Sequence, residues 1–193
     1  MVSVAIQKDN NALIALGGNL PTRSGDSAEL LRAALADLAA AGCALRAVSR
    51  FFATPAYPAG SGPDFVNAAA VISTDLAPRD LLELLHVIEA RHGRERQQRW
   101  GARTLDLDLL AVGDLVLPDS ATQDEWRALS PERQREVAPD RLILPHPRLQ
   151  DRGFVLVPLL DVAPLWRHPR TGNSVEAMVR ALPEDDKAAI RPI

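Results

Sequence analysis

Short apolar runs, each bounded by polar or turn-forming residues, occur four times in the first 112 residues. Three are mostly apolar, and the fourth alternates strictly between apolar and polar positions, the pattern of a strand with one buried face. We predict strands at 12–16, 44–54, 65–74 and 104–112. The Gly17-Gly18-Asn19 sequence after the first run predicts a tight turn.

Two stretches between these runs have leucines and alanines at helical spacing. The first follows three candidate N-caps, Ser24, Asp26 and Ser27, and ends before Gly42, a residue type favoured after helix C-termini. The second starts at Pro78, which a first helical turn tolerates. The order β-α-β-β-α-β predicts an α+β fold with a ferredoxin-like core, in which both helices cover one face of an antiparallel sheet.

The pattern weakens after residue 112. We expect a polar helical insertion at about 119–140, an extended segment at 154–160 and a last helix at 174–182. These extra C-terminal elements would cover the sheet further. We expect residues 1–193 to form a single domain.

Composition and charge restrict the class of protein. The chain has 193 residues, 47% apolar and 24% charged, the mix of a soluble globular protein. Its single cysteine, Cys43, excludes an intrachain disulfide. Neither a secretory leader nor an apolar run of about 20 residues is visible, so we expect a cytoplasmic protein without a membrane span. The net charge of −3 argues against nucleic-acid binding through overall charge.

Asp106 and Asp108 are the sharpest chemical feature of the sequence. Because side chains alternate faces along a strand, both carboxylates lie on one face and the leucines between and beside them on the other. Mg²⁺ held by one or two carboxylates plus substrate phosphates is the usual way to relieve repulsion between such groups. The alternative is a polar strand face that lies in water or pairs with arginines. The arginine-rich loop just before the strand favours the metal.

That loop belongs to a short stretch with five arginines: Arg91, Arg94, Arg96, Arg99 and Arg103. Arginine's planar guanidinium suits bidentate contact with phosphate oxygens, and phosphoryl transfer depends mainly on positioning and charge neutralisation. A solvated charged loop is the alternative. The sequence contains neither a Walker-type nor a dinucleotide-type glycine motif.

Two further segments carry candidate binding residues. Phe65 and Asn67 share a face of their predicted strand, where a ring beside an amide can stack on a flat heterocycle and hydrogen-bond to its edge. Taken alone, Phe65 fits a core residue better, and Asn67 fits a satisfied strand-edge amide. A later segment gathers a histidine, two arginines and an aromatic residue: His146, Arg148, Arg152 and Phe154.

In this order, these segments resemble the 6-hydroxymethyl-7,8-dihydropterin pyrophosphokinase family. The resemblance rests on ALGGNL, ATPAYPAGSGPDFVNAA, IEARHGRERQQRWGARTLDLDLL and LPHPRLQDRGFVLVPLLDVAP, and runs from about residue 12 to 164 apart from the insertion. It implies an enzyme that transfers pyrophosphate from MgATP to 6-hydroxymethyl-7,8-dihydropterin, with release of AMP, in folate biosynthesis.

The resemblance also implies roles for individual residues. Asp106 and Asp108 would hold two Mg²⁺ ions, and Arg94 and Arg103 would act in a mobile catalytic loop. The residues implied on the nucleotide side are Glu89, Arg96, Trp100, His146 and Arg152. Those implied on the pterin side are Thr54, Pro55, Tyr57, Phe65, Asn67 and Phe154, with the two phenylalanines on either side of the ring. Neither the insertion nor a general base is covered by these roles.

Two other functions are compatible with the same fold. One is a ferredoxin-like nucleic-acid-binding module using the arginine loop, which the net acidity and the 4% aromatic content disfavour. The other is a ligand-sensing module without catalysis, which the fold alone does not exclude. Our expectation is a monomer that binds ATP and the pterin, with no nucleic acid and no membrane as partner.

Overall fold

The computed structural model describes residues 11–19, 26–55, 63–93 and 104–193. The strands are β1 (Asn11–Gly18), β2 (Ala44–Val48), β3 (Phe52–Thr54), β4 (Phe65–Ser73), β5 (Asp106–Val112) and β6 (Arg191–Pro192). The helices are α1 (Ser27–Ala40), α2 (Pro78–Arg91), α3 (Ser120–Ala128), α4 (Pro131–Glu136), η1 (Leu149–Asp151), α5 (Gly153–Val162), α6 (Val175–Ala181) and α7 (Glu184–Ala188). None of the helices in these ranges combines the length and apolar character needed to span a bilayer.

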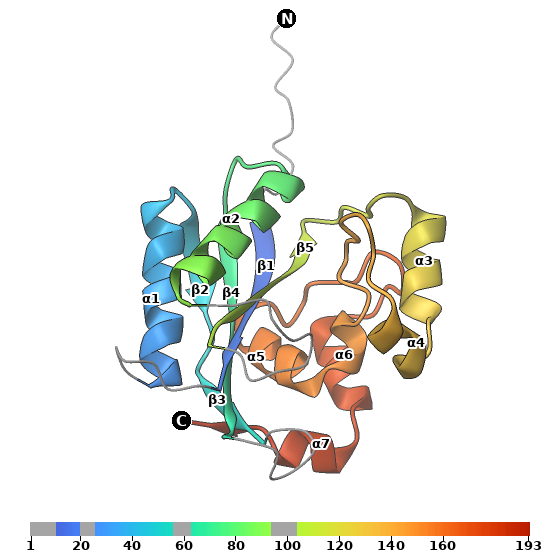
Figure 1. The fold of residues 1–193 in the computed structure, drawn as a ribbon. Helices are drawn as coiled ribbons and strands as arrows, with labels where there is room; N and C mark the ends of the chain where they lie inside the picture. Colours follow the sequence, from blue (N-terminus) through green and yellow to red (C-terminus); the bar gives the residue numbers. More distant parts are fainter. Residues whose placement is uncertain (1–10, 20–25, 56–62, 94–103) are drawn as a thin grey trace, which may run out of the picture.

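The strands form one antiparallel sheet in the order β5-β1-β4-β3-β6, and β2 pairs with the other end of β4. Figure 1 shows α1 and α2 on one side of this sheet and α5 and α6 on the other, with α3 and α4 at the periphery. The predicted antiparallel sheet with two helices on one face is confirmed.

Two apolar clusters hold these layers together. Alternate residues of β1, including Ile14 and Leu16, pack with the leucines of α1 and α2. The intervening residues, Leu13 and Ala15, pack with α5 and α6 on the opposite face. Because β1 is buried on both faces, it reads as a continuous apolar run instead of an alternating one.

The predicted strand at 44–54 is in fact two strands, β2 and β3. Ser49 interrupts the ladder, although its backbone N–H still donates to Ala69 O at 2.9 Å and its hydroxyl accepts from Ala69 N at 2.9 Å. The next residue, Arg50, turns outward and forms a bidentate pair with Asp161 of α5 at 2.9 and 2.8 Å. The strand predicted from residue 104 begins at Asp106.

The prediction of an extended segment at 154–160 is wrong, because these residues form α5. Val155, Leu156 and Leu159 are at most 1% exposed and pack against the sheet and α6. Their separations of one and four residues from Val155 place them on one face of a helix. Burial of this face outweighs the low helix propensity of the valines and of Pro158 inside the helix. The predicted helix at 174–182 is confirmed as α6, with Ser174 as its N-cap, but α7 and β6 follow it.

Candidate active site

The register of three strands brings the candidate residues into one row. Gly17 of β1 pairs with Asp106 of β5 on one side and with Asn67 of β4 on the other. Asp108 pairs with Ala15, which is two residues from Gly17 in β1 and therefore on the same face. Residues opposite each other in a ladder share a face, so the two carboxylates and the Asn67 amide lie on the face that α5 covers.

A recess opens on this face, next to the N-terminal end of α5. Its lining residues are Ala15, Leu16, Gly17, Asn67, Asp106, Asp108 and Phe154. Residues predicted for the metal and residues predicted for the heterocycle therefore line the same small hollow. The sequence pattern places each pair on its own strand, whereas the sheet register joins the two pairs.

Asp108 is paired with Arg152, the residue just before α5. The arginine Nη1 donates to Asp108 Oδ2 at 3.1 Å, and the two side chains are 22% and 30% exposed. The guanidinium also lies 5.7 Å from the centre of the Phe154 ring, close enough for a cation–π contact. One arginine thus links the carboxylate pair to the aromatic wall of the recess.

The donors present fit Mg²⁺ better than a softer metal. Asp106 and Asp108 supply only carboxylate oxygens, the ligands that hard cations prefer. Within the described ranges, no group of three or more His, Cys, Asp or Glu side chains is arranged to hold a metal. This pair would therefore bind Mg²⁺ together with substrate phosphates and not as a closed protein cage.

Glu89 lies beneath the strand that carries the two aspartates. It is 1% exposed, and its Oε1 accepts from the backbone N–H of Leu107 at 2.7 Å. Leu107 lies between Asp106 and Asp108, so this hydrogen bond from α2 fixes the part of β5 from which both carboxylates project. Sequence pattern alone gives no signal for such a buried strand–helix contact.

Asn67 and Thr54 form the polar wall opposite the aspartates. The Asn67 Nδ2 donates to Thr54 Oγ1 at 2.7 Å, and the residues are 6% and 7% exposed. A Cβ added to Gly17 would lie 2.8 Å from Asn67 Oδ1, so the close approach of this amide requires glycine. Gly17 belongs to β1 with no positive φ, and the predicted tight turn at this glycine is wrong.

The two phenylalanines lie at different depths. Phe65 is half-buried and pairs with Thr54 across the ladder. Phe154 is 42% exposed at the recess. Pro55, which follows β3, is exposed.

His146 is held in a defined state beside this region. Its backbone N–H donates to Leu110 O at 2.8 Å, and its Nδ1 accepts from Arg148 N at 3.1 Å. Burial lowers the pKa of His146 to about 4; the carboxylate of Asp108 opposes this shift, and the charge of Arg152 adds to it. The ring is therefore neutral near pH 7, and with Nδ1 as acceptor its proton lies on Nε2.

The remaining predicted site residues lie outside the described ranges: Tyr57, Arg94, Arg96, Trp100 and Arg103. The stretch that contains four of them starts after Gly93 and ends before Thr104. Thr104 Oγ1 donates to Gly93 O at 3.4 Å. Both edges of the arginine-rich stretch therefore lie close to the start of β5.

The sheet, its helical layers and the recess define an α+β protein with a ferredoxin-like core and a carboxylate-lined site. The family model for 7,8-dihydro-6-hydroxymethylpterin-pyrophosphokinase (HPPK) matches residues 13–164. A protein of Synechocystis sp. named 2-amino-4-hydroxy-6-hydroxymethyldihydropteridine pyrophosphokinase is 35% identical over 188 residues, covering 97% of this chain and 82% of its own. A Pseudomonas aeruginosa protein of the same name is 38% identical over 139 residues, covering 72% and 73%.

A solved structure supports the fold. An HPPK-DHPS of Plasmodium falciparum with pterin and p-hydrobenzoate matches with a TM-score of 0.64 at 14% identity, over 95% of this chain and 48% of that longer chain. The chain belongs to the 7,8-dihydro-6-hydroxymethylpterin-pyrophosphokinase family. It is an enzyme that transfers pyrophosphate from ATP to hydroxymethyldihydropterin, a reaction of folate biosynthesis.

Proposed function

We propose that the recess at the start of α5 brings the pterin and the phosphates of MgATP together. The observation that carries this proposal is the row Asp106–Gly17–Asn67 across three strands. With neighbouring strands about 4.8 Å apart, the backbones that carry the carboxylate and the amide are roughly 10 Å apart. A bicyclic pterin with its hydroxymethyl arm is of comparable length, so one end can meet the amide while the other reaches the phosphates.

On the carboxylate side, Asp106 and Asp108 would hold Mg²⁺, and we expect two ions with ATP. Bound Mg²⁺ would supply positive charge to the phosphate oxygens. In the reaction, the pterin hydroxyl oxygen forms a bond to the β-phosphorus, the bond from that phosphorus to the α–β bridging oxygen breaks, AMP leaves, and the hydroxyl proton passes to solvent. Arg94 and Arg103 are proposed to neutralise charge on the transferring group.

On the pterin side, Asn67 is proposed to accept hydrogen bonds from the heterocycle. One Nδ2 hydrogen is bonded to Thr54, and the amide oxygen lies next to Gly17, which also lines the recess. An acceptor there suits the amino and ring N–H donors of a pterin edge. Phe65 and Phe154 are proposed to stack on the ring, and the backbone of Thr54, Pro55 and Tyr57 to complete the contacts.

On the nucleotide side, His146 is proposed to donate its Nε2–H to an oxygen of ATP. Arg152 would add charge at the phosphates, and Arg96 and Trp100 would contact the nucleotide from the arginine-rich stretch. Glu89 is proposed to act from below, through its hydrogen bond to Leu107 N.

Incubation with MgATP and 6-hydroxymethyl-7,8-dihydropterin tests the reaction. We expect AMP and the pterin diphosphate in equal amounts. ADP in place of AMP would indicate an ordinary kinase, and the absence of both products would indicate a ligand-sensing or nucleic-acid-binding module. We further propose that residues 1–193 act as one monomeric domain in the cytoplasm, where both substrates would be available; sedimentation and cell fractionation test this.

A further inference from the structure

His146 lies in a segment, Pro145–Pro147, whose backbone polar groups all have partners. The two prolines have no N–H, so His146 supplies the only backbone donor, and it bonds to Leu110 O of β5 at 2.8 Å. The His146 carbonyl accepts from Leu149 N at 3.0 Å. The carbonyls on either side, those of Pro145 and Pro147, each accept a hydrogen bond from a glutamine side chain.

These two glutamines come from different parts of the chain. Gln150, in η1, reaches back three residues and donates to Pro147 O at 2.9 Å. Gln123 comes from α3 in the insertion and donates through Nε2 to Pro145 O at 3.1 Å. The residue is 0% exposed and is the buried residue of α3. A surface helix ordinarily packs on the protein through buried apolar residues. In α3 the buried residue is instead an amide, which is hydrogen-bonded to the segment that carries His146.

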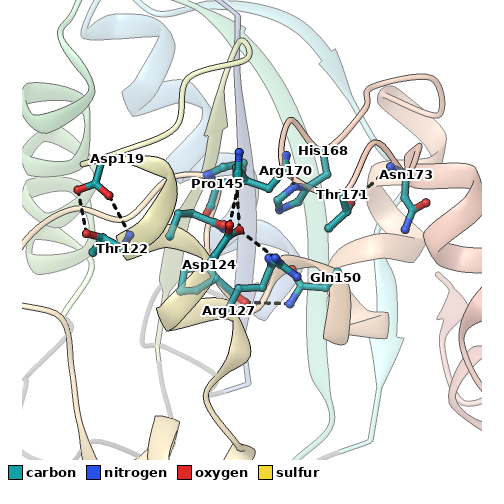
Figure 2. Close-up of polar contacts among 12 residues, drawn as sticks. Asp119, Thr122, Asp124, Arg127, Pro145, Gln150, His168, Arg170, Thr171 and Asn173 are labelled. Carbon is teal, nitrogen blue, oxygen red and sulfur yellow. Dashed lines mark hydrogen bonds and ion pairs between the residues drawn. The ribbon is translucent and has the colours of Figure 1, made fainter.

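The insertion is itself fixed at two places. At its base, Leu117 and Leu144 exchange two backbone hydrogen bonds of 2.8 and 3.1 Å. Next to Gln123, the Asp124 carboxylate accepts from Arg127 Nη2 at 2.9 Å and from Arg170 Nε at 3.1 Å. Figure 2 shows this carboxylate meeting both arginines, one from α3 and one from the turn that precedes α6. Gln123 is therefore presented from a helix that is tied to the rest of the protein.

We propose that the 119–140 insertion is a positioning element of the nucleotide site and that Gln123 is its positioning residue. By holding the Pro145 carbonyl, Gln123 fixes the peptide plane that leads into His146. The orientation of that plane sets where the imidazole Nε2–H points. This inference rests on the proposed contact between His146 and ATP.

Two substitutions isolate the hydrogen bond. Gln123→Met keeps a side chain of similar length without an amide donor, and Gln123→Glu keeps the shape but has no N–H when ionised. The control is Ser174→Ala, which removes the hydrogen bond from Ala177 N to the Ser174 hydroxyl at the N-terminus of α6, away from Pro145. Melting temperatures of all variants show which changes in affinity follow only from a loss of stability.

Two measurements are made on the full chain. The side-chain ¹⁵N resonances of the four histidines are recorded by NMR, with the His146 signals assigned by their loss in His146→Gln. Equilibrium titrations give the affinities for a nonhydrolysable ATP analogue and, separately, for the pterin. In both Gln123 variants we expect shifted His146 resonances and roughly five- to tenfold weaker analogue binding, the effect of about one hydrogen bond, with pterin affinity unchanged. Ser174→Ala should change neither.

Wild-type His146 resonances and wild-type analogue affinity in Gln123→Met would overturn the inference. Equal weakening of both ligands, in proportion to the loss of melting temperature, would also overturn it, since the role of Gln123 would then be stability alone. If the wild-type protein bound no ATP analogue while the His146 resonances still moved in Gln123→Met, the proposed function would fail and the positioning of His146 by Gln123 would stand.

Discussion

The Arg152 guanidinium donates to Asp108 at 3.1 Å while lying 5.7 Å from the centre of the Phe154 ring. Neither member of the ion pair is fully exposed, so the contact is less screened than a surface pair. One side chain therefore connects the carboxylates proposed for Mg²⁺ to the aromatic wall proposed for the pterin. A change at Arg152 should affect both substrates.

Arg152→Ala removes the counter-charge of Asp108. We expect Mg²⁺ to bind more tightly in the absence of nucleotide, because the carboxylate no longer has a cation beside it. The ATP analogue should bind more weakly, and AMP formation should fall by roughly 10- to 100-fold, since a donor to the phosphates is lost. Calorimetric titration of Mg²⁺ and of the analogue, together with steady-state AMP assays, measures all three.

Arg50→Ala is the matched control for that substitution. Arg50 also forms a pair with an aspartate, Asp161 of α5, but away from the recess. Arg50→Ala should at most lower the free energy of unfolding, whereas Mg²⁺ binding, analogue binding and AMP formation should stay at wild-type values. Unchanged analogue affinity and AMP formation in Arg152→Ala would remove Arg152 from the site.

Asp106→Asn and Asp108→Asn test the metal assignment with almost no change of shape. Loss of one carboxylate should lower turnover on the order of 10²-fold or more, because the charge that holds Mg²⁺ on the phosphates is reduced. The melting temperature should remain close to wild type, since both side chains lie at a recess and not in the core. AMP formation is measured over a range of Mg²⁺ concentrations. Near-wild-type rates at limiting Mg²⁺ would show that these carboxylates are not metal ligands.

The period-two pattern was sufficient to place the site residues on their strands. Asp106 and Asp108 share a face opposite Leu107, as predicted, because a strand with one apolar face cannot shift its register without burying charge. Phe65 and Asn67 were placed by the same rule. Pattern alone does not show that the two pairs lie on neighbouring sides of β1, because this depends on long-range strand pairing.

The buried contacts of other residues gave no signal in the sequence. Glu89 and Gln123 are polar residues on helices, and a buried polar residue cannot be told from a solvated one until its partner is known. The close approach of Gly17 to Asn67 also depends on strand pairing. In the 154–160 segment, a short apolar run with valines and a proline fits a strand and a buried helix equally well.

Gly17→Ala should weaken pterin binding selectively. The new Cβ would lie 2.8 Å from Asn67 Oδ1, so the amide must move, and its bond to Thr54 must lengthen or break. We expect pterin affinity to fall by about tenfold, at a cost in stability of roughly 1–3 kcal/mol from overpacking. The affinity for an ATP analogue, titrated in the same variant, is the internal control. Equal affinities for the pterin in variant and wild type would mean that Asn67 does not read the heterocycle.

We expect His168 to make the stability of the protein depend on pH. The residue is 0% exposed, its Nδ1 accepts from Arg170 N at 3.1 Å, and Figure 2 shows it beside Arg170 and the α3 helix. Burial, with the charge of Arg127 as a second cause, lowers the pKa of His168 to about 4 from the ordinary value of 6.5. The folded state therefore holds the neutral ring, whereas the unfolded chain takes up a proton at higher pH.

The sign of the effect follows from this difference. The contribution of His168 to stability is complete above pH 6.5 and is lost as the pH falls towards 4, because the unfolded state binds the proton first. Between pH 7 and pH 4.5 the loss should amount to about 2–3 kcal/mol. His168→Asn keeps an acceptor for Arg170 N and cannot titrate, so its free energy of unfolding should decline less over this interval by about that amount. Urea denaturation at both pH values measures the difference, and His146, whose pKa is also lowered, contributes equally to both proteins. An identical decline in wild type and variant would mean that the His168 ring is accessible to protons in the folded state.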